Sequence, residues 1–73
     1  MEPNEIFELI IKADEKIKYA KPGTGDVRAG QARQLLEQAR GAAREIDNDA
    51  LVAQADRRLA DLDALASGAD PGE

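Results

Sequence analysis

The stretch ARQLLEQARGAAREID, residues Ala32–Asp47, decides the fold of this 73-residue chain. Its apolar residues recur every three or four positions, which is the spacing of one face of an α-helix. Alanine, leucine, arginine, glutamine and glutamate are all strong helix formers, and a narrow alanine-rich face lets a neighbouring helix approach closely. The predicted buried positions are Ala32, Leu35, Leu36, Ala39, Ala42, Ala43 and Ile46.

Two further amphipathic segments flank this central helix. The first starts at Glu2-Pro3-Asn4, where Pro is tolerated in the opening turn and Asn4 can cap, and it must end before Pro22-Gly23. The last starts after Asp47-Asn48-Asp49, where Asn48 can adopt the left-handed conformation that ends one helix and Asp49 can cap the next. The predicted buried positions of these two helices are Ile6, Leu9, Ile10, Ala13, Ile17 and Ala20, and Leu51, Val52, Ala55, Leu59, Leu62 and Ala66.

These patterns predict an all-α fold, an antiparallel three-helix bundle in one domain over residues 1–66. We expect helices at about 4–20, 26–46 and 49–66, with Thr24 or Asp26 as the cap of the second, and a disordered tail at 67–73. Gly30 and Gly41 lie inside the second helix but off its buried face. They indicate either tolerated slack or room for a group that packs behind them.

The composition excludes several classes of function. With no cysteine and no histidine, the chain has no thiolate metal site and lacks the commonest general base and metal ligand. A net charge of −5 argues against nucleic acid and a membrane surface as partners. Residues 6–11 are the most apolar segment, but they are too short to span a bilayer and follow no basic signal-peptide region. We expect a cytoplasmic protein, and the rich use of alanine, arginine and aspartate is typical of a high-GC bacterial genome.

The sequence offers little for catalysis. Thr24 and Ser67 are the only hydroxyl nucleophiles of the serine and threonine type, and no histidine accompanies either. The alternation of Glu45, Asp47 and Asp49 is similar to the opening of a calcium loop, but apolar residues follow where further oxygen ligands are needed. The run GTGDVRAGQ lacks the lysine of a phosphate loop. We therefore predict no catalytic, cofactor-binding or metal-binding residues, no cofactor, and a protein that is not an enzyme.

The segment KADEKI at 12–17 returns as QADRRL at 54–59, so that small and apolar residues of the outer helices align at one offset. Together with Gly25-Asp26 and with Ala32 and Ala39 spaced seven apart around Leu36, this pattern resembles the tetratricopeptide repeat (TPR) family over about residues 6–65. The resemblance implies a helix A, helix B, helix A arrangement of one and a half repeats, with Ala13 and Ala55 as the small residues of the two A helices. The family's proline after helix B and its Leu-Gly pair are absent, so a plain three-helix bundle stays open. The microtubule-interacting and trafficking (MIT) domain is similar in shape.

Three surface features exceed what folding requires. Arg33, Arg40 and Arg44 form a basic strip on the central helix, predicted to face away from the core; either it pairs with Glu37 or it suits an acidic peptide. Phe7 and Ile11 lie one turn apart, either as anchors for a partner helix or as the flank of a wide buried face. The last feature is an alanine row on the third helix, either a docking surface or simply good helix formers: Ala53, Ala60 and Ala64.

The resulting expectation is a small non-catalytic module that binds a protein or peptide, with no nucleic acid and no membrane as partner. The alternative is a homodimerising structural or regulatory bundle that buries Phe7, Ile11 and the alanine row in a symmetric interface.

Overall fold

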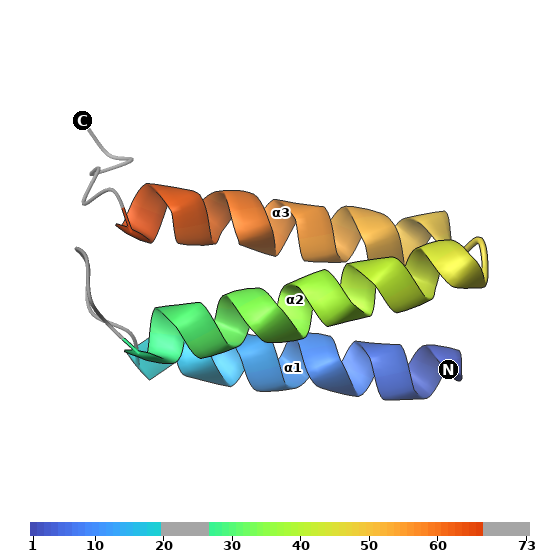
Figure 1. Ribbon diagram of the computed structural model, residues 1–73, viewed down its shortest axis with the longest axis horizontal. Helices are drawn as coiled ribbons and strands as arrows, with labels where there is room; N and C mark the ends of the chain where they lie inside the picture. Colours follow the sequence, from blue (N-terminus) through green and yellow to red (C-terminus); the bar gives the residue numbers. More distant parts are fainter. Residues whose placement is uncertain (20–26, 67–73) are drawn as a thin grey trace.

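The computed structural model describes residues 1–19 and 27–66, and within them it contains three α-helices and no strand. They are α1 (Pro3–Tyr19), α2 (Val27–Glu45) and α3 (Asp49–Ala66). The central helix α2 lies between the other two and runs antiparallel to both (Figure 1). The prediction of an all-α antiparallel three-helix bundle is confirmed. The predicted capping at Thr24 or Asp26, the burial of Ala20 and Ala66, and the tail at 67–73 lie outside the described residues and side chains.

The residue that caps the start of α1 is not the predicted one. The carbonyl of Glu2 accepts hydrogen bonds from the amides of Glu5 at 3.0 Å and Ile6 at 3.1 Å. The Glu5 carboxylate in turn accepts one from the Glu2 amide at 3.0 Å. Glu2 therefore occupies the capping position and Pro3 is the first helical residue, where the missing N–H of proline costs nothing. The prediction that Asn4 caps this helix is wrong, because Asn4 already lies in the first turn.

The turn between α2 and α3 uses the predicted residues, shifted by one position. Asp47 takes the left-handed conformation, with φ of 54°. The sequence predicts this conformation for Asn48, one residue later. The amide of Asn48 donates to the carbonyl of Ala43 at 2.8 Å and that of Asp47 to the carbonyl of Arg44 at 3.1 Å, the two bonds of a Schellman motif. The Asn48 side chain then accepts a hydrogen bond from the Leu51 amide at 3.1 Å and caps α3 in place of Asp49.

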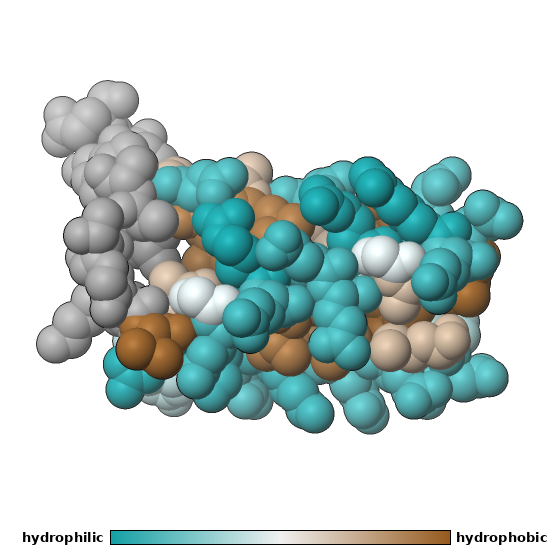
Figure 2. All heavy atoms as spheres, viewed as in Figure 1, coloured by the Kyte–Doolittle hydropathy of each residue, from teal (hydrophilic) through white to brown (hydrophobic). Residues whose placement is uncertain are grey.

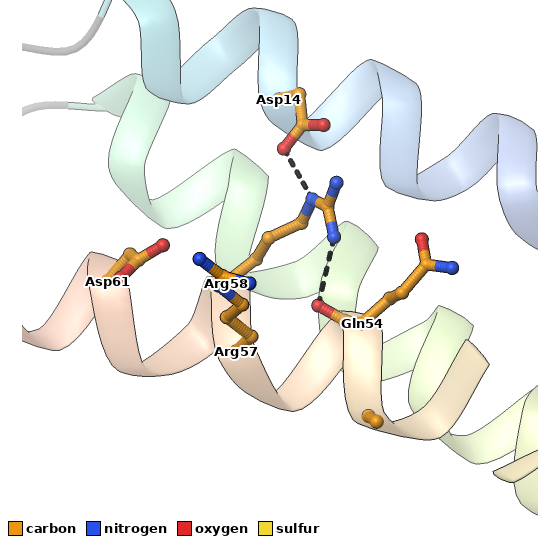
Figure 3. A pocket seen from close by; sticks show the side chains of 6 residues that line it. Asp14, Gln54, Arg57, Arg58 and Asp61 are labelled. Atoms are coloured by element: carbon orange, nitrogen blue, oxygen red, sulfur yellow. Dashed lines mark hydrogen bonds and ion pairs between the residues drawn. The ribbon is translucent and has the colours of Figure 1, made fainter. Parts of the chain in front are cut away.

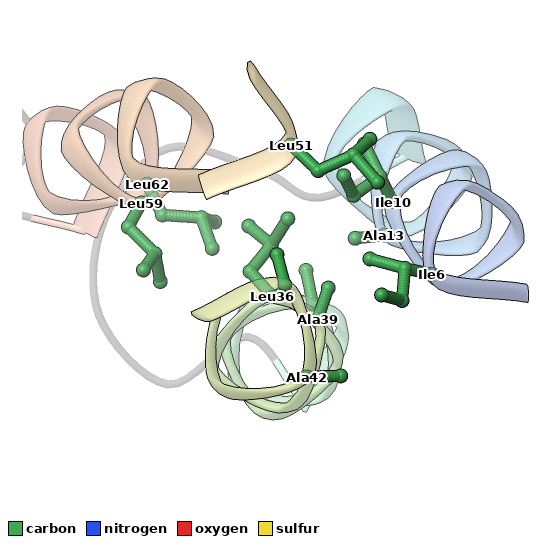
Figure 4. Packing of buried hydrophobic residues seen from close by; sticks show 11 residues of the cluster. Ile6, Ile10, Ala13, Leu36, Ala39, Ala42, Leu51, Leu59 and Leu62 are labelled. Atoms are coloured by element: carbon green, nitrogen blue, oxygen red, sulfur yellow. The ribbon is translucent and has the colours of Figure 1, made fainter. Parts of the chain in front are cut away.

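The core forms where α2 meets each neighbour (Figure 4). Leu36 points toward Leu59 and Leu62 of α3, whereas Ala39 and Ala42 face Ile6 and Ala13 of α1. The small side chains of Ala39 and Ala42 leave room for α1, which is the arrangement that the alanine-rich face predicts. The fully buried large side chains are Ile6, Ile10, Leu36 and Leu62.

Most predicted core positions are confirmed, and the exceptions lie at the edges. Leu9, Ile17, Leu35 and Val52 are only partly buried and pack against the central cluster. Ile46 is 38% exposed, so its prediction as a core residue is wrong. The physical reason is that α2 ends at Glu45 and the chain turns away from the core at the next residues.

The two glycines of α2 face open space. An added Cβ at either Gly30 or Gly41 would have no atom within 4 Å outside its own helix. Of the two predicted readings, the described structure favours tolerated slack over a group that packs behind the helix.

Replacing Gly41 by alanine should therefore stabilise the protein. Alanine in the middle of an exposed helix is favoured over glycine by about 1 kcal/mol, and no neighbouring atom opposes the new methyl group. Urea denaturation followed by circular dichroism would measure the gain. The change Gly30→Ala is the matched second site and should act in the same direction; destabilisation by both would contradict the described packing of α2.

Replacing Asp47 by glycine should also stabilise the protein, by about 0.5–1 kcal/mol. Glycine adopts a positive φ without a Cβ penalty, and the change removes a negative charge from the negative end of the α2 dipole. The control is Asp49→Gly, which lies in the first turn of α3 and should not stabilise. An equal gain from both variants, in denaturation curves, would show that the left-handed conformation is not the cause.

Candidate functional site

Phe7 and Ile11 lie on the outer side of α1, next to the core positions but not within the core. Phe7 is 45% exposed and Ile11 is 42% exposed, although their neighbours Ile6 and Ile10 are completely buried. Of the two alternatives for this pair, the one in which Phe7 and Ile11 form the flank of a wide buried face is therefore wrong. Residues four apart on a helix lie one above the other, so the two side chains form one contiguous apolar patch.

The seam between α1 and α3 is held by an ion pair (Figure 3). The Nε of Arg58 donates to the Asp14 carboxylate at 2.7 Å, and its Nη1 donates to the carbonyl of Gln54, one turn earlier in α3, at 3.2 Å. At the start of α3, Leu51 points toward Ile10 (Figure 4). The contact between α1 and α3 is much smaller than the contact that either makes with α2. The two helices therefore leave a groove along the bundle.

This groove is open and polar, with a volume of about 540 Å³. Its lining comes from one residue of α1 and from one side of α3: Asp14, Ala53, Gln54, Arg57, Arg58 and Asp61. Phe7 precedes Asp14 by seven residues, or two helical turns, and hence lies on the same side of α1. Of the predicted surface residues, Ala53 lines the groove itself, whereas Phe7 is not part of its lining and lies two turns before Asp14 on the same side of α1.

The remaining members of the alanine row lie further along α3. Ala60 is exposed and Ala64 is partly buried. Arg57 stands between Ala53 and Ala60 on the same side of the helix, so the row is not a continuous smooth surface. As a docking surface for close helix contact, the row is interrupted by this long side chain.

The predicted basic strip has a different place from the one expected. Arg33 and Arg40 do not face away from the core but lie at its edge, beside α3. Arg40 pairs with Asp56 at 2.9 Å, and Arg33 pairs with Asp63. The pairing expected with Glu37 is thus replaced by two bridges between helices. Arg44 lies beyond them, exposed in the last turn of α2.

The sequence analysis did not predict which residues pair in the three bridges between helices, Arg33–Asp63, Arg40–Asp56 and Arg58–Asp14. The signal that could have revealed them is the position of each residue next to a buried neighbour: Asp14 follows Ala13, Asp56 follows Ala55, and Arg58 precedes Leu59. A charged residue at the edge of a buried helix face lies within reach of the adjoining helix. Which helix it reaches depends on the packing.

Charge is distributed unevenly along the bundle. The start of α1 and the α2–α3 turn lie at the same end (Figure 1), and exposed carboxylates dominate there. These acidic residues are Glu2, Glu5, Glu8, Glu45, Asp47 and Asp49. A shallow hollow of about 170 Å³ at this end is lined by Met1, Glu5, Glu8, Leu9 and Lys12.

The rest of the described surface is mainly hydrophilic. Figure 2 shows one face of the molecule, on which hydrophilic side chains predominate and hydrophobic atoms appear in the seams between helices. Within the described residues, no polar or charged side chain is buried and no group of acidic residues could hold a metal ion. Nor is any helix in residues 1–19 or 27–66 long and apolar enough to cross a membrane.

Comparison with known proteins found no family model, no curated protein and no solved structure that matches the chain. The resemblance to the tetratricopeptide and MIT families therefore stays a prediction.

The Arg40–Asp56 bridge should couple the two helices weakly. A double-mutant cycle with Arg40→Gln and Asp56→Asn should give an interaction energy of about 0.2–1 kcal/mol, because both side chains are partly exposed to water. Raising the salt concentration to about 1 M should reduce it. The matched control pairs Asp56→Asn with Arg44→Gln and should show no coupling. Equal coupling in the two cycles would refute the specific pairing.

Proposed function

We propose that the protein is a small non-catalytic module that binds another protein through the outer side of α1. The observation that carries this proposal is the exposed pair of Phe7 and Ile11, beside a core that is already complete without them. Partly exposed aromatic and aliphatic side chains that lie together are the usual anchors of protein interfaces. The adjoining groove between α1 and α3 gives a partner helix a place to lie along them.

The chemistry of the chain supports a binding role over a catalytic one. Every histidine- or cysteine-based mechanism lacks its residue. The charged groups beside the groove, Asp14 and Arg58, are engaged with each other. This pair links α1 to α3, which is a structural role.

The basic strip contributes less than the sequence suggests. Because Arg33 and Arg40 are bridged to α3, an acidic peptide would have to compete with two ion pairs within the chain to use them. Arg44 alone does not make a strip. We therefore centre the proposed interface on α1.

The alternative, a symmetric homodimer, would use the same apolar pair. A fully buried aromatic side chain covers about 150–250 Å², so two side chains that are less than half exposed offer on the order of 200 Å². A stable interface needs about 800 Å² from each partner. The apolar area therefore favours a transient complex over a permanent dimer.

A photo-crosslinking experiment would test the proposal. We expect benzoylphenylalanine at position 11 to form one defined protein adduct in the cells that make the protein, because Ile11 would lie inside the interface. Mass spectrometry would identify the adduct. The change Phe7→Gln in the same chain should abolish it without loss of helical structure, since Phe7 lies outside the core.

The control places the same cross-linker at Gln38, which is exposed on α2. Adducts of equal yield from positions 11 and 38, or none from position 11, would remove α1 as a binding face.

A further inference from the structure

The side chains around Phe7 and Ile11 define the chemistry of what can dock there. Glu8 lies three residues before Ile11 and Glu15 four residues after it, so both carboxylates are neighbours of the apolar pair on the same helix. Asp14, the third acidic neighbour, is already balanced by Arg58. Both Glu8 and Glu15 are exposed, and neither forms an ion pair within the described residues.

Basic groups are sparse near the pair. Lys12 lines the other hollow together with Met1, Glu5 and Glu8, so that Glu8 lies between the apolar pair and this lysine. Lys18 lies two turns beyond Ile11, and its Nζ stands 5.7 Å from the centre of the Tyr19 ring. On the α3 side of the groove, Arg57 and Asp61 offset each other in formal charge. The face is therefore apolar at its centre and acidic at its margin.

We infer that this face binds a basic amphipathic helix of a partner protein, an inference that rests on the proposed function. The partner's apolar side would cover Phe7 and Ile11, and its lysine or arginine side chains would reach Glu8 and Glu15. The acidic residues at the start of α1 and in the α2–α3 turn would also attract the basic helix over distances longer than a direct contact. Their electric fields add to those of Glu8 and Glu15 and increase the rate at which the two proteins associate.

A second copy of this chain fits the face poorly. Two copies docked through Phe7 and Ile11 would each bring the carboxylates of Glu8 and Glu15 to the edge of the interface, and neither copy would supply an excess of basic groups to balance them. Like charges across an interface are unfavourable, and each copy brings a net charge of −5. The same argument excludes an acidic helix.

Binding to synthetic peptides would test the inference. The probe is a helix about as long as α1, with leucine on one face and lysine on the other, and titration calorimetry would measure its affinity for the full chain. Two comparison peptides are needed, one with glutamate in place of lysine and one with the probe's composition in scrambled order. We expect only the ordered basic peptide to bind, and we expect Phe7→Gln to weaken it at least about tenfold.

Two matched variants separate the apolar and charged contributions. Val27→Gln also removes an exposed apolar side chain, 71% exposed and at the start of α2, and should leave the affinity unchanged. The double change Glu8→Gln and Glu15→Gln should weaken binding of the basic peptide several-fold. The affinity that remains should fall less between about 0.1 and 1 M salt than the affinity of the wild type does. Circular dichroism of each variant would verify the fold, which is expected to persist because all three wild-type positions are exposed.

The outcomes separate this inference from the proposed function. Equal binding of the ordered and scrambled basic peptides, or binding that is indifferent to Phe7, would overturn the inference as mere charge attraction. Binding of the acidic peptide, or a dimer that sedimentation shows to depend on Phe7, would also overturn it while leaving α1 as the binding face. Absence of a cross-link from position 11 would instead remove the proposed function.

Discussion

Both large interhelical contacts of this fold pass through α2, so the fold depends on one helix burying two different sides at once. Toward α3 it presents Leu36, and toward α1 it presents Ala39 and Ala42. Leucine side chains fill the space between helices, whereas the alanines among them leave room for a neighbouring helix. Because these two sides belong to one rigid helix, they set where α1 and α3 lie relative to each other. The small α1–α3 contact is a consequence of this arrangement.

The groove and the exposed pair follow from the same constraint. Since α1 buries its apolar side mainly against α2, its contact with α3 is small, and there Ile10 meets Leu51 and Asp14 meets Arg58. Phe7 and Ile11 lie farther around the helix and find no neighbour that would cover them. A bundle of three helices in which α2 makes the large contacts with both others has one open side, and Phe7 lies on the same side of α1 as Asp14, which lines the groove there.

Polar side chains at the edges of the buried faces join the helices. Arg33, Arg40 and Arg58 each bridge to a carboxylate of another helix, and each of these pairs is partly exposed to water. Such pairs contribute little free energy individually, but they favour one helix orientation over others by their positions. The same residues, seen only as charges on helical surfaces, are easily mistaken for a binding strip.

The sequence by itself determined the all-α three-helix fold and most of the buried positions, because helical periodicity and turn-forming residues are local properties of the chain. It also determined that Phe7 and Ile11 were candidates for a surface role. Only the tertiary structure decided that Arg33 and Arg40 are engaged with α3, that Ile46 escapes the core, and that Asp14 and Ala53 line one groove. These outcomes depend on the distance and rotation between helices, which arise from the packing of side chains far apart in the sequence and which no single helix specifies alone.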